Sequence, residues 1–352
     1  MKSKLVLENG REFLGLNFGS SKEVIGELFF STSMVGYQEI LSDPSYYGKI
    51  VCLSYPLIGN YGLADDDYEY KNIHIKGYVV GENNDNPSNF RFTRTLSEAM
   101  SENNVTGIES LDTREIVRII RDNGAMRAMN CDESKPLEDC LEEIKSYKEE
   151  DNLIKYVSCK KAWYSRTTNP LYSLVVLDLG VKRSFIKELN EYGINVTVVP
   201  YLTTIDQIKK LKPDGLIISN GPGNPNNLNE LTSKINELKG KLPILGLGLG
   251  ADLIALSYGC KLEKMKHGHH GNNLPVKNLD TNKIEITSQN HFYSIKLNDD
   301  SLLEITHKNV IDNDVEGFKD QTNKIYGYHI NYAKTLDEND NIIINFLKNI
   351  KK

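Results

Sequence analysis

The stretch PILGLGLGAD, residues Pro243–Asp252, decides the fold of the second half of the chain. An apolar run enters three alternating glycines and continues into a helical pattern over Ala251–Tyr258, which Gly259 closes. Glycine at such a junction allows either a tight turn or a close approach of helix to strand. We therefore expect a strand over 243–247 that turns directly into a helix.

Apolar strands and short helices alternate in the residues before this stretch. The predicted strands are Leu174–Leu179, Asn195–Pro200 and Gly215–Ser219, and the predicted helices are Arg183–Tyr192, Ile205–Leu211 and Leu228–Leu238. This rhythm predicts an α/β fold with a doubly wound, mostly parallel sheet covered by helices. Ligands of such sheets bind at the carboxyl ends of the strands, so we expect chemistry just after residues 219 and 247.

The first half of the chain has short alternating segments instead. Predicted strands at Lys4–Glu8, Val24–Ser31 and Ile50–Ser54 are separated by turns, and Asp112–Asn123 has a helical apolar stripe that ends before Gly124. We predict an N-terminal α+β domain over 1–150, a linker over 151–171 and a second domain over 172–352. The charged segment within 135–161 is expected to be helical.

Composition excludes several classes of protein. The chain has 352 residues, a net charge of −6 and five scattered cysteines. It contains no apolar run long enough for a membrane span and no signal-peptide pattern, so we expect no membrane association. The acidic balance without a basic cluster argues against nucleic acid as a partner. Cysteines without a CxxC pair fit a reducing cytoplasm, the expected location.

Two motifs at the predicted strand ends have competing interpretations. The loop Ser219–Pro225 (SNGPGNP) can point backbone N–H groups at an anion or can be an ordinary rigid turn. The glycines of 246–251 fit a dinucleotide fingerprint, a nucleophile elbow with Gly248 at its apex, or a close crossing of helix and strand. The dinucleotide interpretation is disfavoured because several predicted strands precede this one.

Two segments contain side chains of the kinds that bind metal ions. The run HGHHG contains His267, His269 and His270, but no Cys or carboxylate stands nearby at ligand spacing. We expect a structural loop there and no metal site. The run Asp65–Glu69 lacks the spaced oxygen ligands of a calcium loop and is expected to be a solvated turn. The chain has no GxxxxGK[ST] loop, so we expect no ATP site of that kind.

Many motifs of the chain, in order and spacing, resemble the class I (triad-type) glutamine amidotransferases, and most closely the small subunit of carbamoyl phosphate synthetase. In the second half they are Ser219–Pro225, Gly246–Tyr258, Lys264–Lys277, Thr287–Tyr293 and Gly327–Asn331. In the first half they are Gly26–Glu27, Ser31–Leu41, Asp43–Tyr46, Tyr55–Asn60, Ser88–Arg91 and Gly107–Arg114. The resemblance spans nearly the whole chain.

The resemblance implies a role and a partner. The family's small subunit hydrolyses glutamine and passes ammonia to a large subunit, which makes carbamoyl phosphate from bicarbonate and ATP for pyrimidine or arginine biosynthesis. A Cys at the elbow attacks the amide, a His moves the proton, and a Glu two residues after the His orients it. ATP is expected only on the large subunit, and no cofactor is expected on this chain.

The chain departs from the family at the reacting positions. The triad positions are Gly248, His329 and Asn331, of which only the His is kept. Asp252 stands in place of a substrate-holding Gln, and Phe292 replaces a family Gly in the run Asn290–Tyr293. The positions matching family glutamine or oxyanion contacts, and their neighbours in the remnant site, are Ser45, Gly221, Gly223, Leu249, Asn290 and Tyr293.

These departures predict that glutaminase activity is lost. Removal of the nucleophile from a comparable triad costs on the order of 10⁶ in turnover, and here four positions of one pocket are altered. We expect a scaffold or regulatory partner of a large subunit. The alternative is a standalone binding protein that keeps the remnant pocket for a small carboxylate or amide, and whether the chain is itself an enzyme stays open at this point.

Overall fold

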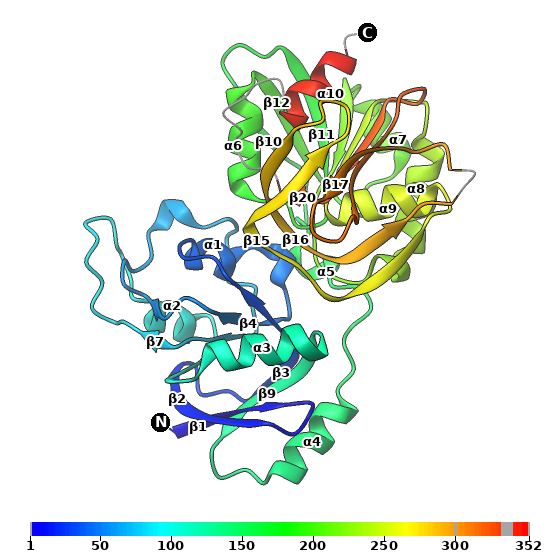
Figure 1. Ribbon diagram of the computed structural model, residues 1–352. Coiled ribbons are helices and arrows are strands. Elements are labelled where there is room, and N and C mark those ends of the chain that lie inside the picture. The colour runs from blue at the N-terminus through cyan, green and yellow to red at the C-terminus, as the bar shows by residue number, and fades with distance from the viewer. Residues whose placement is uncertain (1, 299–300, 332–340, 351–352) are drawn as a thin grey trace. The chain divides into compact units, whose positions relative to one another are not determined.

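The computed structural model describes residues 2–298, 301–331 (for residue 331 only the backbone) and 341–350. The chain divides into two compact units, Met1–Glu150 and Asp151–Lys352 (Figure 1). Each unit has apolar clusters of its own, so each is described by itself. No helix among the described residues is long and apolar enough to cross a membrane.

The first unit is built on a closed β-barrel. Its strands, in spatial order, are β1 (Lys2–Leu7), β2 (Glu12–Gly19), β8 (Thr106–Glu109), β6 (Gly77–Val79), β4 (Ile50–Leu53), β3 (Val24–Ser31) and β9 (Met126–Asp132). The pairing of β9 with β1 closes the barrel and leaves no exposed sheet edge. A small parallel pair, β5 (Leu57–Ile58) and β7 (Glu82–Asn83), lies outside the barrel sheet.

Helices complete this α+β unit. They are α1 (Tyr37–Ser42), α2 (Leu96–Glu102), α3 (Thr113–Asn123) and α4 (Leu137–Ser146), with the 3-10 turns η1 (Pro44–Tyr46) and η2 (Asp65–Asp67). Asp112 caps α3, because its side chain accepts a hydrogen bond from the Glu115 N–H. Ile116 and Ile120 of α3 join the barrel's interior cluster, whereas Cys140 and Ile144 of α4 pack in a second cluster.

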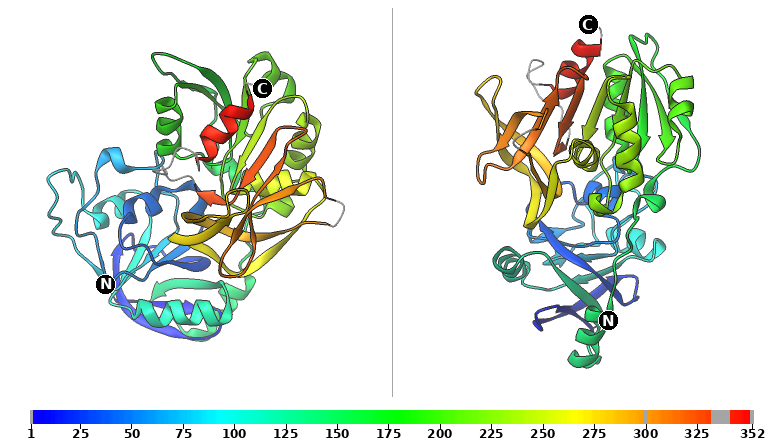
Figure 2. Two further views of the ribbon diagram at one scale, coloured as in Figure 1. Left: turned by 45° about the horizontal axis from the view of Figure 1, so that its top comes forward. Right: turned by 90° about the vertical axis from the view of Figure 1, so that its right-hand side faces the viewer.

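The second unit contains one sheet of eleven strands. In spatial order they are β10 (Trp163–Ser165), β12 (Ile194–Pro200), β11 (Tyr172–Asp178), β13 (Gly215–Ile218), β14 (Ile244–Leu247), β19 (Ile325–Tyr328), β18 (Val315–Asp320), β17 (Glu304–Asn309), β15 (Lys261–Asn278), β16 (Ile284–Lys296) and β20 (Ile330–Asn331). The strands from β12 to β19 are parallel neighbours, which confirms the α/β prediction for this half. Figure 2 shows the long strands β15 and β16, yellow to orange, curving away from the parallel strands.

Helices cover both faces of the parallel strands. They are α5 (Ile154–Val157), α6 (Arg183–Glu191), α7 (Ile205–Lys210), α8 (Asn229–Leu238), α9 (Leu249–Ser257) and α10 (Ile342–Ile350), with the 3-10 turn η3 (Pro225–Asn227). Alternate residues of β11 point to opposite faces: Val175 and Leu177 pack with α7, α8 and α9, whereas Leu174 and Val176 pack with α6 and α10. The sheet is therefore doubly wound.

Two segments differ from the sequence-based expectation. Residues 151–171, expected to be a linker, lie in the second unit, because Trp163–Ser165 pairs with Thr197 and its neighbours as strand β10. The segment 135–161 is only partly helical: α4 ends at Ser146, and the chain stays irregular until α5 begins at Ile154. In addition, the antiparallel strands β15 to β18 were not predicted from the sequence.

Candidate functional site

A strained turn joins β14 to α9 at the carboxyl edge of the sheet. β14 ends at Leu247, α9 begins at Leu249, and Gly248 between them has φ 51° and ψ −116°. That conformation is unfavourable for a residue with a side chain and is the geometry of a nucleophile elbow. A Cβ added to Gly248 would lie 3.2 Å from Cβ of Asn220, a tight contact that a side chain at this position could make only if Asn220 moved slightly.

The flanking glycines have a different function from Gly248. A Cβ on Gly250 would collide with the carbonyl oxygen of Ile218 in β13, and a Cβ on Gly246 would press against α9 itself. Close approach of helix and strand therefore requires these two glycines. Of the three interpretations of this motif, the elbow applies to Gly248 and the close crossing applies to Gly246 and Gly250.

The glycine–proline loop is anchored at the neighbouring strand end. Oγ of Ser219 accepts a hydrogen bond of 2.9 Å from the Leu179 N–H. A Cβ on Gly221 would collide with the Leu179 carbonyl oxygen, and Gly223 has φ +104°, so both positions need glycine. The loop thus lies against the end of β11, and the exits of β11, β13 and β14 meet at one edge of the sheet, as predicted.

His329 lies beside the elbow because it directly follows β19, the parallel neighbour of β14. The Gly248 N–H donates to the carbonyl oxygen of Tyr328 at 2.8 Å, which places the next residue, His329, at the turn. Nε2 of His329 lies 2.7 Å from Oδ1 of Asp252, one turn into α9, and both side chains are buried. Burial alone would lower the pKa of His329, but the Asp252 carboxylate outweighs it and raises that pKa.

This contact changes what His329 can do chemically. Asp252 is an acceptor, so Nε2 carries a proton and is engaged on the side facing α9. Among the side chains that the structure describes, none hydrogen-bonds Nδ1 of His329. Nε2 of His329 is therefore engaged by a carboxylate, and the elbow residue beside it, Gly248, has no side chain that could serve as a nucleophile.

The remnant substrate positions on β16 pack against the neighbouring strand β15. His270 pairs with Asn290 across the two strands, and its Nδ1 lies 2.8 Å from Oδ1 of Asn290. The ring of Phe292 packs on His270 with centroids 4.3 Å apart. The carbonyl oxygen of Tyr293 accepts a hydrogen bond of 3.0 Å from Nδ1 of His291.

The structure brings most predicted site residues together. Gly221, Gly223, Gly248, Leu249, Asp252 and His329 lie at the strand exits of the second unit, and Asn290, Phe292 and Tyr293 lie on β16 of the same sheet. Ser45 belongs to η1 of the first unit, where its N–H donates to Asp43 at 2.9 Å. Asn331 ends β20 and pairs with Ser288, but its side chain is outside the described part of the chain.

Sequence reasoning missed Glu316, whose carboxylate is buried beside His269 and His291. It lies 47 positions after His269, so a search for carboxylates near HGHHG could not find it. One signal was present: Glu316 interrupts the apolar pattern of the strand VEGF, and a charged residue there is unusual unless it is paired.

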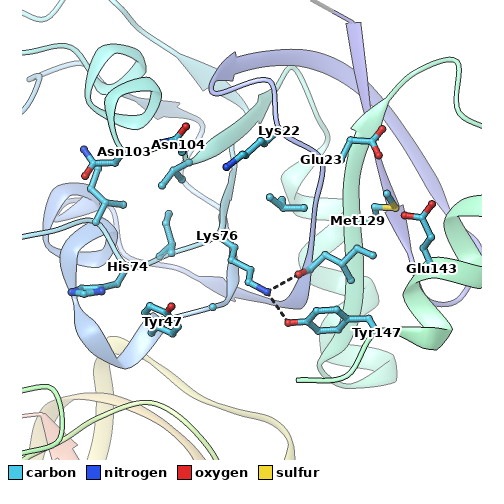
Figure 3. Close-up of a pocket in the computed structure, with 16 residues that line it drawn as sticks. Lys22, Glu23, Tyr47, His74, Lys76, Asn103, Asn104, Met129, Glu143 and Tyr147 are labelled. Atoms are coloured by element: carbon cyan, nitrogen blue, oxygen red, sulfur yellow. Dashed lines mark hydrogen bonds between the residues drawn. The ribbon is translucent and has the colours of Figure 1, made fainter. Parts of the chain in front are cut away.

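The first unit has a cavity of about 650 Å³ that the sequence did not predict. Figure 3 shows Lys76 reaching across it, where Nζ donates to the Ile25 carbonyl at 3.1 Å and the Tyr147 hydroxyl at 2.7 Å. His74 lines the same cavity, and its burial lowers its pKa to about 4. No pair of nucleophile and base lines this cavity within the residues described.

Comparisons with known proteins cover both units. Residues 5–129 match the family described as "Carbamoyl-phosphate synthase small chain, CPSase domain", and residues 175–348 match "Glutamine amidotransferase class-I". The carbamoyl phosphate synthase pyrimidine-specific small chain of Bacillus subtilis (strain 168) is 42% identical over 322 residues, covering 92% of this chain and 88% of its own. The carbamoyl phosphate synthase small chain of Staphylococcus epidermidis is 44% identical over 322 residues, covering 90% and 87%.

A solved structure of a glutamine amidotransferase from Thermotoga maritima is similar to part of the chain. The superposed region covers 46% of this chain and 75% of the Thermotoga maritima chain, with 15% sequence identity and a TM-score of 0.37.

Proposed function

The chain belongs to the carbamoyl phosphate synthase small-chain family, and we propose that it is a small chain without glutaminase activity that acts as the scaffold or regulatory partner of a large chain. One observation carries the proposal: the elbow keeps its backbone conformation while Gly248 stands at its apex. Glycine has no atom that can attack an amide carbon, so the covalent route of the family cannot begin.

The environment of His329 supports the same proposal. Asp252 is paired to Nε2 of His329 at 2.7 Å and raises the pKa of this histidine against the effect of burial, which favours the protonated imidazole over the neutral form that a general base needs. A Glu at position 331 would orient the imidazole in the family, and this chain has Asn there. The reacting groups are therefore altered on both sides of the histidine.

The frame around these groups is kept, which supports a partner role. Both matched domains are present, the barrel of the first unit is closed, and the glycine–proline loop keeps its glycines. A chain that no longer hydrolyses glutamine can still hold or regulate a large chain that takes free ammonia as its nitrogen source. Under this proposal the ATP chemistry takes place on the large chain.

The test is co-expression of the full chain with a large chain from the same genome. We expect a co-purifying complex that makes carbamoyl phosphate from bicarbonate, ATP and ammonium but not from glutamine, and that releases no glutamate above buffer background. Release of glutamate at the rate of a working family member would overturn the loss of glutaminase. Failure to co-purify, together with a tightly bound small carboxylate or amide, would instead support the standalone binding protein.

A further inference from the structure

Three buried side chains from different strands converge beside the candidate site. His269 of β15 and His291 of β16 face each other across the strand pair, and Glu316 comes from β18. Nδ1 of His269 lies 3.2 Å from Nε2 of His291 and 2.9 Å from Oε1 of Glu316. Nε2 of His291 lies 3.2 Å from Oε2 of Glu316, and none of the three residues is more than 7% exposed.

The outer nitrogen of each imidazole is occupied by an acceptor. Nδ1 of His291 lies 3.0 Å from the Tyr293 carbonyl oxygen, which can only accept, so this nitrogen carries the proton. Nε2 of His269 lies 2.7 Å from the carboxylate of Asp312, which likewise accepts. In their neutral forms, both histidines therefore turn a lone pair toward the same point, where Glu316 places its carboxylate.

Lone pairs and a carboxylate facing one another repel unless a cation lies between them. We propose that Nδ1 of His269, Nε2 of His291 and the carboxylate of Glu316 bind one divalent transition-metal ion, with Zn²⁺ as the ion that this donor set fits best. Two imidazoles and one carboxylate are a ligand combination that Zn²⁺ uses in proteins. The site shares no residue with the triad positions, so it stands independently of the proposed function.

The spacing of the ligand atoms agrees with this assignment. Tetrahedral Zn²⁺ with bonds of about 2.0–2.1 Å separates its ligand atoms by roughly 3.3 Å. The three separations here are 2.9 to 3.2 Å.

Outer partners also fit a metal site. A histidine ligand commonly donates its second N–H to a carboxylate or a backbone carbonyl, which fixes the tautomer and the ring orientation. Asp312 does this for His269 and the Tyr293 carbonyl does it for His291. The Glu316 carboxylate in turn accepts from Nδ2 of Asn309 at 3.2 Å.

A cavity of about 240 Å³ lies on the outer side of His269 and is lined by Asp312, Asp314, Ser294 and Lys296. The side chain of Asp312 is 38% exposed, whereas that of His269 behind it is 9% exposed. Asp312 thus lies between solvent and the outer nitrogen of His269.

A proton is the competing occupant. Burial lowers the pKa of His269, but Glu316 and Asp312 outweigh it and raise that pKa. Burial raises the pKa of Glu316, but the charge of His291 and hydrogen bonds from His269 and His291 outweigh it and hold that pKa well below its usual range. A protonated His269 would therefore pair with the carboxylate of Glu316 without a metal ion. A metal ion in this cluster would be detected as one bound ion per chain, whereas a proton would leave no bound metal, so metal titration distinguishes the two.

The experiment titrates the full chain, stripped of metal with a chelator, with Zn²⁺ against a chromophoric competitor and with Co²⁺ at pH 8. We expect about one ion per chain, and visible Co²⁺ absorption of the intensity typical of four-coordinate N/O ligation. Asp312→Asn, at a partly exposed position, should weaken Zn²⁺ binding about 10- to 100-fold. Glu316→Gln, which removes a ligand, should weaken it more.

His267→Asn is the matched control, because His267 lies two positions from His269 but outside the ligand set. It should bind Zn²⁺ as tightly as the unaltered chain. Near-ultraviolet circular dichroism checks that every variant is folded. The proposal is wrong if the folded chain binds no stoichiometric ion at pH 8, or if His267→Asn weakens binding as much as Asp312→Asn does.

Discussion

At the residue scale, the altered positions of the candidate site compensate for one another. A side chain at Gly248 would be strained at φ 51° and ψ −116°, and glycine relieves that strain. His329 is buried and would favour its neutral form, but Asp252, four positions after Gly248, supplies a charge partner at 2.7 Å. In the proposed role, in which the pocket does not hydrolyse glutamine, these groups stabilise the fold instead of reacting.

Restoring the nucleophile alone should not restore activity. We expect Gly248→Cys to release no glutamate from glutamine, because Asp252 still occupies Nε2 of His329 and position 331 still lacks a carboxylate. A glutamine-like electrophile should also fail to label the new thiol. The measurement is a glutaminase assay with mass spectrometry of the treated protein.

The same variant should be less stable than the unaltered chain. A side chain in this strained conformation costs about 1–3 kcal/mol, so Gly248→Cys and the control Gly248→Ala should lower the urea midpoint by similar amounts. If the electrophile labelled the thiol of Gly248→Cys while neither variant released glutamate, the elbow would still activate a thiol, contrary to our expectation.

His74 should make the first unit sensitive to acid. Its burial lowers its pKa to about 4, below the value of about 6.5 in an unfolded chain. As pH falls from 6.5 to 4, the unfolded chain takes up the proton first, so stability is lost in that window by up to about 3 kcal/mol. His74→Phe keeps an aromatic ring beside Tyr47 and Tyr70 and removes this titration.

Urea unfolding of both proteins at pH 7 and pH 4.5 checks this prediction. Other groups titrate equally in the two proteins, so the difference between their pH responses isolates His74. The unaltered chain should lose more stability than His74→Phe on acidification. If both proteins lost the same stability on acidification, protonation of His74 would not be a cause of the acid sensitivity.

At the element scale, buried strands of the second unit depend on glycine for packing. A Cβ on Gly327 of β19 would collide with the ring of Phe318 on the neighbouring strand β18. Phe318 is fully buried, so the ring has no free space into which it can move. The two strands can pair at this register only because one side chain is absent.

Gly327→Ala should therefore destabilise the chain by about 1–3 kcal/mol through overpacking. Gly77→Ala on β6 is the matched control, since its Cβ would meet Ile50 and Val24 at ordinary distances of 3.4 to 3.6 Å. The measurement is the free energy of unfolding by urea for both variants. Equal effects of the two substitutions would refute the steric argument.

At the scale of the whole molecule, the closed barrel makes the first unit self-sufficient. β9 pairs with both β1 and β3, so the barrel closes within residues 1–150. We expect a fragment of residues 1–150 to unfold cooperatively, with a near-ultraviolet circular dichroism signal. A fragment of residues 1–125 lacks β9, leaves β1 and β3 as open edges, and should aggregate or stay unfolded.

Local patterns were enough to predict several elements closely. The strand Val24–Ser31 and the helix capped by Asp112 form at the predicted residues, and the turn at Gly248 follows β14 directly. Each depends on neighbours in sequence: alternation, a capping side chain or a glycine. The strands after residue 260 were not predicted, because β15 and β16 are long, polar and irregular. Their pairing has register shifts at Lys264–His269 and Gly271–Leu274.

The sequence by itself determined the family, the α/β fold of the second unit and the glycine at the position of the family's nucleophile. Each of these can be recognised from short runs of consecutive residues, without knowing the fold. Only the tertiary structure decided that Asp252 engages His329 across 77 positions and that Glu316 joins His269 across 47. Those contacts depend on which strands become neighbours and in what register. Pairing of that kind arises from the packing of the whole sheet, which no local pattern contains.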